Sequence, residues 1–334
     1  MFNKPTVFIV GAGASAECGL PTGSQLKDRI RGGLGFQFEG GQLRKGDEAL
    51  LQLLRGRFSQ VNPYIKAGHE LSATITTFPS IDEALHWWRA RLEIVELGKL
   101  AIAHYILDAE RRSPLAGKQR SVNIEAANDT WLATFISMAL SGLEQRAVSR
   151  AFENITIINF NYDRTIETYL YSALERRGGI SSEEAKQCVT GLKVIRPYGS
   201  IGKLDWQEQA GIPYGGHENS VAAQVEKNIR TFTEQAQEET VSASINQALG
   251  NAEIAIFLGF GFHQQNMKLF EPIPPGTRKI HALMATTKGI DDKNHEAITS
   301  HLLRLGIIAS PTLVACKAGE LLIQLRPTIT MAAV

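Results

Sequence analysis

The sequence predicts an α/β fold built on an open parallel sheet, and two kinds of segment lead to this prediction. Short apolar runs rich in β-branched residues occur at 7–10, 155–160 and 253–258, and each ends in glycine or polar residues. Runs of this length are typical of parallel strands that are buried on both faces. Between the first two runs, residues 36–143 show helical spacing and little β character. We therefore expect a Rossmann-like open parallel sheet with helices on both faces and a large helical insertion after the first βα unit.

The length and composition fit a single globular unit. The chain has 334 residues, 43% of them apolar and 21% charged, with a net charge of +1. We expect one domain over 1–334, in which 36–150 form the insertion and 151–330 complete the core. The balanced charge gives no indication of direct binding to nucleic acid or to a membrane surface. No apolar run approaches the ~20 residues of a membrane span.

The cysteines and the first residues point to a cytoplasmic protein. Cys18, Cys188 and Cys316 are far apart and make no CxxC pair, so they cannot form a four-cysteine zinc site, and we expect no metal. A sparse, odd count suits a reducing compartment. The start, MFNKPTVFIV, is too short before its glycine turn to be a signal peptide. Each cysteine is expected to be a small buried residue, although Cys18 lies close enough to the first motif to be considered as a reactive thiol.

The stretch 6–30 holds the first candidate site. The predicted strand at 7–10 turns through Gly11-Ala12-Gly13-Ala14-Ser15 into a helix. Glycines lack the Cβ that would keep a ligand from the backbone, and the N–H groups at a helix start favour phosphate. The third glycine of GxGxxG is absent, because Ala16 stands there, so a plain tight turn is the alternative. The helix is then interrupted, since Gly19 and Pro21 cannot continue it cheaply.

The insertion is predicted from helical periodicity. After Gly23 we expect a helix capped by Ser24 and ended by the glycines at 32–35. Further helices are expected at 48–54, 81–88, 92–107 and 131–143. The corner Ser80-Ile81-Asp82-Glu83 is interpreted as a helix N-cap with an acidic first turn, and a functional corner is the alternative. Trp87 and Trp88 are expected to be core or interface aromatics.

Polar residues follow the second predicted strand. Asn161 and Asp163 come directly after the apolar run that ends at Phe160. Open α/β sheets place ligands at the carboxyl ends of their strands, so both are candidate site residues. Turn and cap chemistry is the alternative, because Asn and Asp favour both roles.

Two further motifs follow predicted strands. The run 192–196 leads into Pro197-Tyr198-Gly199-Ser200, and the run 253–258 leads into Gly259-Phe260-Gly261-Phe262-His263. His263 is interpreted either as a loop histidine bonded to backbone or as a catalytic base. The remaining expected strands are 279–283 and 312–314, and the remaining expected helices are 165–174, 182–189, 228–249, 293–305 and 318–325. The loop 210–217 is expected at the surface.

The four motifs together resemble the sirtuin family. The glycine turn with its broken helix is similar to the family's GAG-x-S segment, Asn161 and Asp163 keep the Asn and Asp of its N-x-D motif, and Gly199-Ser200 match its H-G-S. The FNYD sequence resembles the bacterial sirtuin-like branch rather than the histone deacetylases. The chain also lacks the cysteine zinc ribbon that the deacetylase sirtuins carry. The resemblance implies NAD as the ligand, with no zinc. It assigns the pyrophosphate and cofactor loop to one group of residues: Gly11, Ala12, Gly13, Ser15, Gly19, Pro21 and Thr22.

The resemblance also implies an activity. The expected reaction is cleavage of the nicotinamide–ribose bond of NAD, in anti-phage defence, often with an oligomeric or helicase/ATPase-type partner. Asn161 would orient water or the ribose hydroxyls, and Asp163 would support the site electrostatically. Gly199 and Ser200, with Gly259, Phe260 and Gly261 on the adenosine side, would complete the cofactor contacts.

Tyr198 stands where the family has its histidine base. A tyrosine with a pKa near ~10 is a poor base at neutral pH. It would contact the ribose, or act as a base only with a strongly lowered pKa, and His263 is the other candidate base. Two alternatives therefore remain: a sensor that holds NAD or ADP-ribose without turnover, and a regulatory subunit whose nucleotide site is vestigial.

Overall fold

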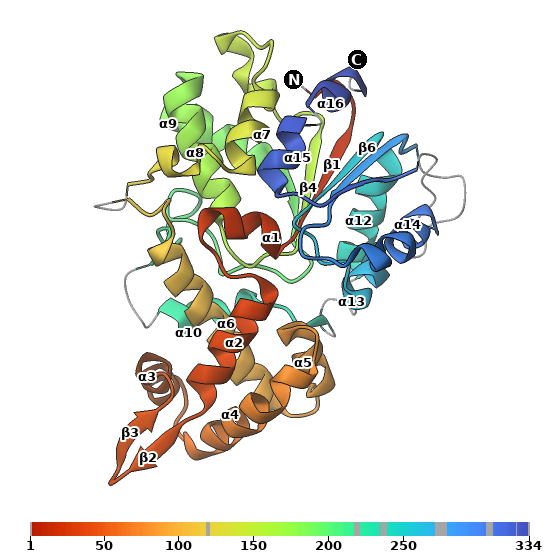
Figure 1. Cartoon of the computed structure of the whole chain (residues 1–334). Coiled ribbons are helices and arrows are strands. Elements are labelled where there is room, and N and C mark those ends of the chain that lie inside the picture. The colour runs from red at the N-terminus through yellow and green to blue at the C-terminus, as the bar shows by residue number, and fades with distance from the viewer. Residues whose placement is uncertain are drawn as a thin grey trace.

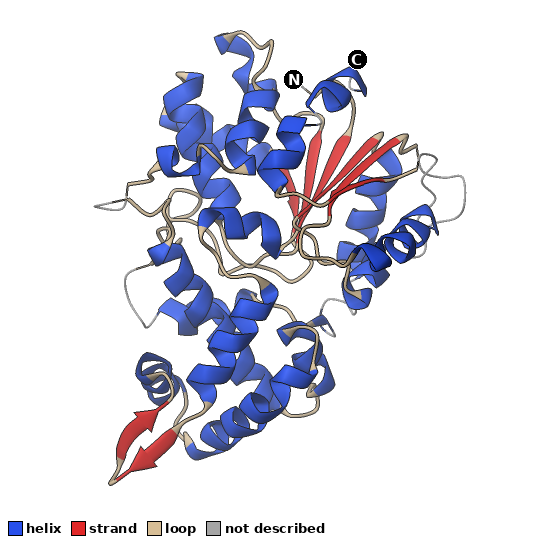
Figure 2. Ribbon diagram, in the orientation of Figure 1, coloured by secondary structure: helices blue, strands red, loops and turns tan. Residues whose placement is uncertain are grey.

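The computed structural model describes residues 2–117, 121–216, 221–232, 234, 239–270, 279–304, 310–324 and 326–332. A parallel sheet with helices on both faces forms one part of the molecule, and a helical body lies beyond the carboxyl ends of its strands (Figure 1). The same view coloured by secondary structure shows the strands of the sheet in one part and mainly helices in the other (Figure 2).

The sheet has six parallel strands in the order β5-β4-β1-β6-β7-β8. Their bounds are β1 Thr6–Val10, β4 Ile155–Asn159, β5 Lys193–Ile195, β6 Ile254–Leu258, β7 Ala282–Thr286 and β8 Thr312–Val314. Counted along the chain, this is the order 3-2-1-4-5-6 of a Rossmann-like sheet. The fold class predicted from the sequence is confirmed. β7 begins at Ala282 rather than at Lys279, as the sequence had indicated.

The sheet is buried on both faces, which explains why its strands are continuously apolar. Along β1, Val7 and Ile9 enter one apolar core, and Phe8 and Val10 enter the other. One face is covered by α12 (Glu239–Asn251) and α14 (His295–Arg304), and α13 (Gln264–Met267) lies beside them. The other is covered by α7 (Trp131–Ala139), α8 (Thr165–Gly178), α9 (Ser182–Gly191) and α15 (Ala318–Gln324), and α16 (Arg326–Ala332) follows α15.

The helical body is formed by residues 23–112, together with a later segment. Its elements are α2 Gly23–Leu34, α3 Glu48–Arg57, α4 Asn62–Thr74, α5 Ile81–Trp87, α6 Leu92–Arg112 and α10 Val221–Val225. It also carries a hairpin, β2 (Gln37–Glu39) and β3 (Gln42–Lys45), which projects from its far end (Figure 1). Short 3₁₀ helices occupy 16–18, 75–77, 124–127, 145–150, 226–228, 268–270 and 292–294.

The structure differs from the sequence prediction within this segment. Thr22, not Ser24, caps α2, with a capping box to Gln25, and the helix continues through Gly32 and Gly33. The stretch 36–143 contains the β2–β3 hairpin. Helix α7 packs against α8 and α15 beside the sheet rather than with α3–α6, because its apolar side chains belong to that core.

The helices after the sheet strands also have other bounds than the periodicity indicated. At the start of the expected helix over 228–249, Ile229 forms a bridge with Gly199 instead, and α12 (Glu239–Asn251) confirms the later part. Residues 233 and 235–238 of this predicted helix, and His217 of the predicted loop, lie outside the described residues.

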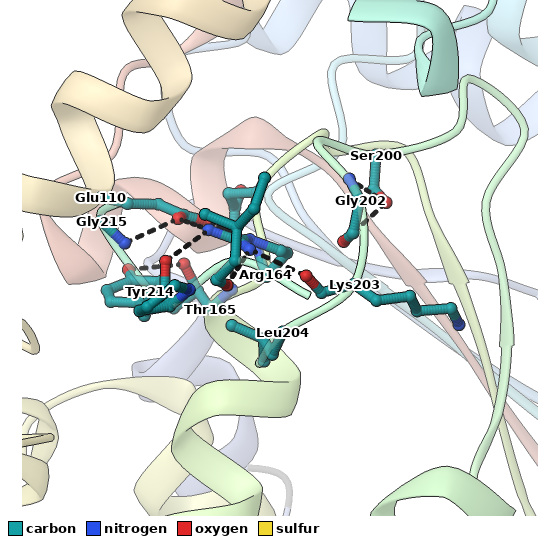
Figure 3. Close-up of polar contacts among 12 residues, drawn as sticks. Glu110, Arg164, Thr165, Ser200, Gly202, Lys203, Leu204, Tyr214 and Gly215 are labelled. Atoms are coloured by element: carbon teal, nitrogen blue, oxygen red, sulfur yellow. Dashed lines mark hydrogen bonds and ion pairs between the residues drawn. The ribbon is translucent and has the colours of Figure 1, made fainter. Parts of the chain in front are cut away.

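A fully buried ion pair joins the helical body to the sheet. Glu110, near the end of α6, is 0% exposed, and Arg164, after β4, is 2% exposed. Arg164 donates Nη2 to Glu110 Oε2 at 2.6 Å and Nε to Oε1 at 3.2 Å (Figure 3). Glu110 also accepts the backbone N–H groups of Arg164 and Gly215, at 2.9 and 3.1 Å. The other guanidinium N–H groups donate to the carbonyls of Lys203, Ile212 and Pro213.

All five N–H groups of Arg164 therefore have acceptors. Removing one partner of such a pair leaves an uncompensated buried charge, which costs about 3–5 kcal/mol. We expect Arg164→Met to lower the free energy of unfolding by that amount. The double variant Arg164→Met/Glu110→Leu should lose less than the single one, as measured by urea denaturation. Strictly additive losses from the two single variants would contradict this account.

Candidate functional site

The candidate site lies where the strand order reverses, between β1 and β6. In open α/β sheets the crevice outside the carboxyl ends of the strands at this point is the usual ligand site. The glycine turn after β1 and the Gly259 turn after β6 meet here. The N–H of Gly11 donates to Leu258 O, and the N–H of Gly13 donates to Gly259 O, both at 2.9 Å.

The glycines of both turns are required by the protein's own backbone. A Cβ on Gly11 would lie 2.5 Å from Gly259 O, and one on Gly13 would lie 2.9 Å from Gly259 Cα. Gly259 has φ +57°, and its Cβ would lie 2.0 Å from Ala14 N. These contacts show that the glycines also serve the packing of the two turns against each other. The amides of Gly13 and Ala14 already donate within the protein, to Gly259 and Gly11.

The helix after the turn is interrupted as the sequence predicts. α1 covers only Ala12–Ser15, and the 3₁₀ turn that follows ends at Gly19, whose φ is +81°. Pro21 is buried, and Thr22 caps α2. Gly13 and Gly19 are exposed, so the turn and the broken loop have accessible backbone at the surface.

Asn161 links the second motif to the first. The residue is 6% exposed. Its Nδ2 donates to Gly11 O at 3.0 Å and to Ser15 Oγ at 2.8 Å. Because a backbone carbonyl only accepts, the contact with Gly11 fixes which end of the amide carries the N–H groups. Asn161 Oδ1 forms no hydrogen bond with any residue that the structure describes.

Asp163 has the turn role that was the alternative for it. Its Oδ1 accepts the N–H of Thr165 at 3.0 Å at the start of α8, and its side chain is 2% exposed. Arg196 holds the backbone of this turn by donating Nη1 to the carbonyls of Asn161 and Asp163, at 2.8 and 3.0 Å. Its Nη2 forms two hydrogen bonds with Glu167. Sequence reasoning treated Arg196 only as the end of β5, although a cation after a buried strand was a signal.

Tyr198 is a neutral hydrogen-bond donor. It is 2% exposed, and Oη donates to Asn266 Oδ1 at 2.6 Å. Burial, together with the charge of Asp82, raises the pKa of Tyr198 well above its usual value. This is the opposite of the lowered pKa that the base role requires, so the structure argues against Tyr198 as the base.

The residues after Tyr198 also serve the fold. Gly199 has φ +71°, and a Cβ there would lie 2.0 Å from Asn228 O, so this glycine allows contact with another loop. Ser200 Oγ accepts the N–H of Gly202 in a local turn, which lies near the Arg164 cluster (Figure 3). Gly199 and Ser200 form no hydrogen bond with Asn161.

Aromatic side chains fill the space above β4 and β6. Phe260 is 2% exposed, and its ring lies 5.0 Å from that of Phe160 and 6.0 Å from that of Phe270. Gly261 is exposed, and a Cβ there would lie 2.9 Å from Nε2 of His263. His263 immediately precedes α13, and desolvation lowers the pKa of its ring.

The helical body adds a residue that the sequence analysis did not assign to the site. Ser80 Oγ caps α5 by accepting the N–H of Glu83 at 3.1 Å, which confirms the cap interpretation of this corner. In the same turn, Asp82 accepts a hydrogen bond from Tyr162 Oη, and burial raises the pKa of Asp82 to about 6. Asp82 and Tyr162 are 80 residues apart, so no local pattern indicates their contact.

Cys18 is not a reactive thiolate, because burial raises the pKa of its thiol to about 12. Among the described residues, no group of three or more His, Cys, Asp and Glu side chains is placed to hold a metal ion.

A groove of about 490 Å³ lies beside β4 and β5, between η5 (Gln145–Arg150) and α9. It contains none of the predicted site residues.

No protein-family model matches the chain, and no curated protein matches it in sequence. Within the described ranges, none of the helices has the length and apolar character needed to cross a membrane.

The contact between the two glycine turns can be tested by adding one methyl group. We expect Gly259→Ala to lower the free energy of unfolding by more than about 2 kcal/mol, because it combines a left-handed backbone with a backbone clash. Gly32→Ala is the control, since a Cβ on this α2 glycine meets nothing within 4 Å. The control should be neutral or stabilising by up to about 1 kcal/mol. Equal effects in urea denaturation would contradict the packing role.

Proposed function

We propose that this chain is a sirtuin-like protein that binds NAD at the carboxyl ends of β1 and β6 and cleaves its nicotinamide–ribose bond. The observation that carries the proposal is the pair of hydrogen bonds from Asn161 Nδ2 to Gly11 O and Ser15 Oγ. Two motifs that are 150 residues apart thereby meet at the reversal point of a Rossmann-like sheet, where dinucleotides bind.

The chemistry requires a water and a stabilised, oxocarbenium-like ribose carbon. Asn161 Oδ1, free of hydrogen bonds to the described residues, would accept from a ribose hydroxyl or from the water. Asp163 would contribute negative charge near the developing positive charge. Exposed backbone at Gly13 and Gly19 would lie along the pyrophosphate. The resemblance extends the proposal to NAD depletion in anti-phage defence, in a homo-oligomer or with a helicase/ATPase-type partner.

Nicotinamide release from NAD by the purified chain tests this proposal. We expect Asn161→Ala to lower the rate by about 10²-fold or more, the range expected for a lost transition-state hydrogen bond. Because the same change removes two buried hydrogen bonds, the melting temperature of the variant is measured alongside. Asn251→Ala, at the exposed end of α12, is the control and should keep the wild-type rate. Absence of release alone and with a partner, or an Asn161→Ala variant equal to wild type, rejects the enzyme proposal.

A second candidate function is favoured by Tyr198. A neutral phenol that is hydrogen-bonded to Asn266 suits a site that holds NAD or ADP-ribose without turnover. NAD binding in a calorimeter, with no nicotinamide formed over long incubation, would support this sensor over the enzyme.

A further inference from the structure

We propose that Asp82, a residue of the helical insertion, is the general base for NAD cleavage at this site. This inference rests on the proposed function and names the group that takes the proton. It assigns the insertion a chemical role in addition to a structural one.

The Asp82 carboxylate is positioned by α5 and by a side chain from the turn after β4. Asp82 lies in the first turn of α5, which packs against α2 and α6 in the helical body. Tyr162, which stands between Asn161 and Asp163, donates its Oη to Asp82 Oδ1. The carboxylate is therefore held by the side chain of a residue in the turn that carries Asn161. Its Oδ2 makes no hydrogen bond with another residue in the described part of the chain, and the backbone N–H of Asp82 itself acts on the carboxylate.

The residue at the position of the family's histidine is not a base. Tyr198 occupies the position of the family's histidine, and its proton is committed to Asn266. Asp82 is hydrogen-bonded to Tyr162, and its charge helps to raise the pKa of both the Tyr162 and the Tyr198 phenol. Among the three groups, only Asp82 can take a proton near neutral pH.

His263 is the competing candidate. Its ring packs against Gly261, and its side chain forms no hydrogen bond with a described residue, so nothing holds it toward Asn161. Glu83 and Lys27 act on it with opposite sign. Asp82, in contrast, is fixed by Tyr162.

The electrostatic surroundings suit a base that is ionised at neutral pH. Desolvation raises the pKa of Asp82 to about 6, and the Tyr162 hydrogen bond opposes that rise. The face that α6 turns to α5 is apolar, with Gly98 against Leu85. The charged and titratable groups around α5 come from its own helix, from α2, and from the segments after β4, β5 and β6: Glu83, His86, Arg89, Lys27, Tyr162, Tyr198, His263 and Lys268.

The step is balanced without another reactant. The oxygen of a water attacks C1′ of the nicotinamide ribose while its proton passes to Asp82 Oδ2. The C1′–N bond breaks, and its electron pair remains on the ring nitrogen of nicotinamide, which leaves neutral. Asp82 then releases the proton to solvent, so NAD and water give ADP-ribose, nicotinamide and one proton.

The test is the pH profile of nicotinamide release by the full chain and its variants. Asp82→Asn keeps an acceptor for Tyr162 but removes the base, and the rate should fall by about 10²–10⁴-fold with NAD affinity retained. In wild type, release should rise with pH through about 6, as Asp82 loses its proton. Tyr162→Phe removes a hydrogen bond that lowers this pKa, so the rise should move to higher pH. Asp292→Asn, an exposed aspartate before α14, is the matched control and should leave the profile unchanged.

The outcomes separate this inference from the proposed function. Release by wild type that survives Asp82→Asn, or that is lost in His263→Ala instead, overturns the role of Asp82 and leaves the enzyme proposal standing. An inactive wild type overturns both. If Asp82→Asn does not fold, Tyr162→Phe decides: a shifted profile supports the base, and a lower rate with an unshifted profile reduces Asp82 to a structural contact.

Discussion

The buried contact between Arg164 and Glu110 determines how the two parts of the molecule sit together. Glu110 belongs to the last turns of α6, and Arg164 follows the Asn161–Asp163 turn. Two buried charges are tolerated here because the carboxylate also accepts backbone N–H groups and every guanidinium N–H has an acceptor. With α6 fixed in this way, α5 is brought to the carboxyl end of the sheet, and Asp82 reaches Tyr162. The chemistry proposed for the site therefore depends on an interaction outside it.

The second constraint is the close approach of two backbone turns. Gly11, Gly13 and Gly259 meet without side chains between them, so the loops after β1 and β6 form one surface. This contact uses amides that a dinucleotide site would otherwise offer to phosphate. Recognition of NAD is then expected to depend more on Asn161 and on the exposed backbone of the broken helix than on a helix N-terminus.

The sheet was predictable from the sequence, because strands buried on both faces have to be continuously apolar, as Val7–Val10 and Ile254–Leu258 are. The placement of Asn161 near the glycine turn followed from the rule that parallel strands end at one edge. The Asp82–Tyr162 contact and the raised pKa of Tyr198 were not predictable, since both arise from packing between distant segments. Helix α7 was assigned to the insertion for the same reason: periodicity marks a buried face but not the core that receives it.

The most direct measurement is a crystal structure of the chain with ADP-ribose, which has the adenosine, the diphosphate and the ribose that remain after cleavage. The account predicts the diphosphate along residues 12–19 and a ribose hydroxyl about 3 Å from Asn161 Oδ1, with Asp82 facing C1′. ADP-ribose bound in the groove between η5 and α9, or aromatic rings of Phe160 and Phe260 still filling the edge while the ligand binds elsewhere, would contradict it.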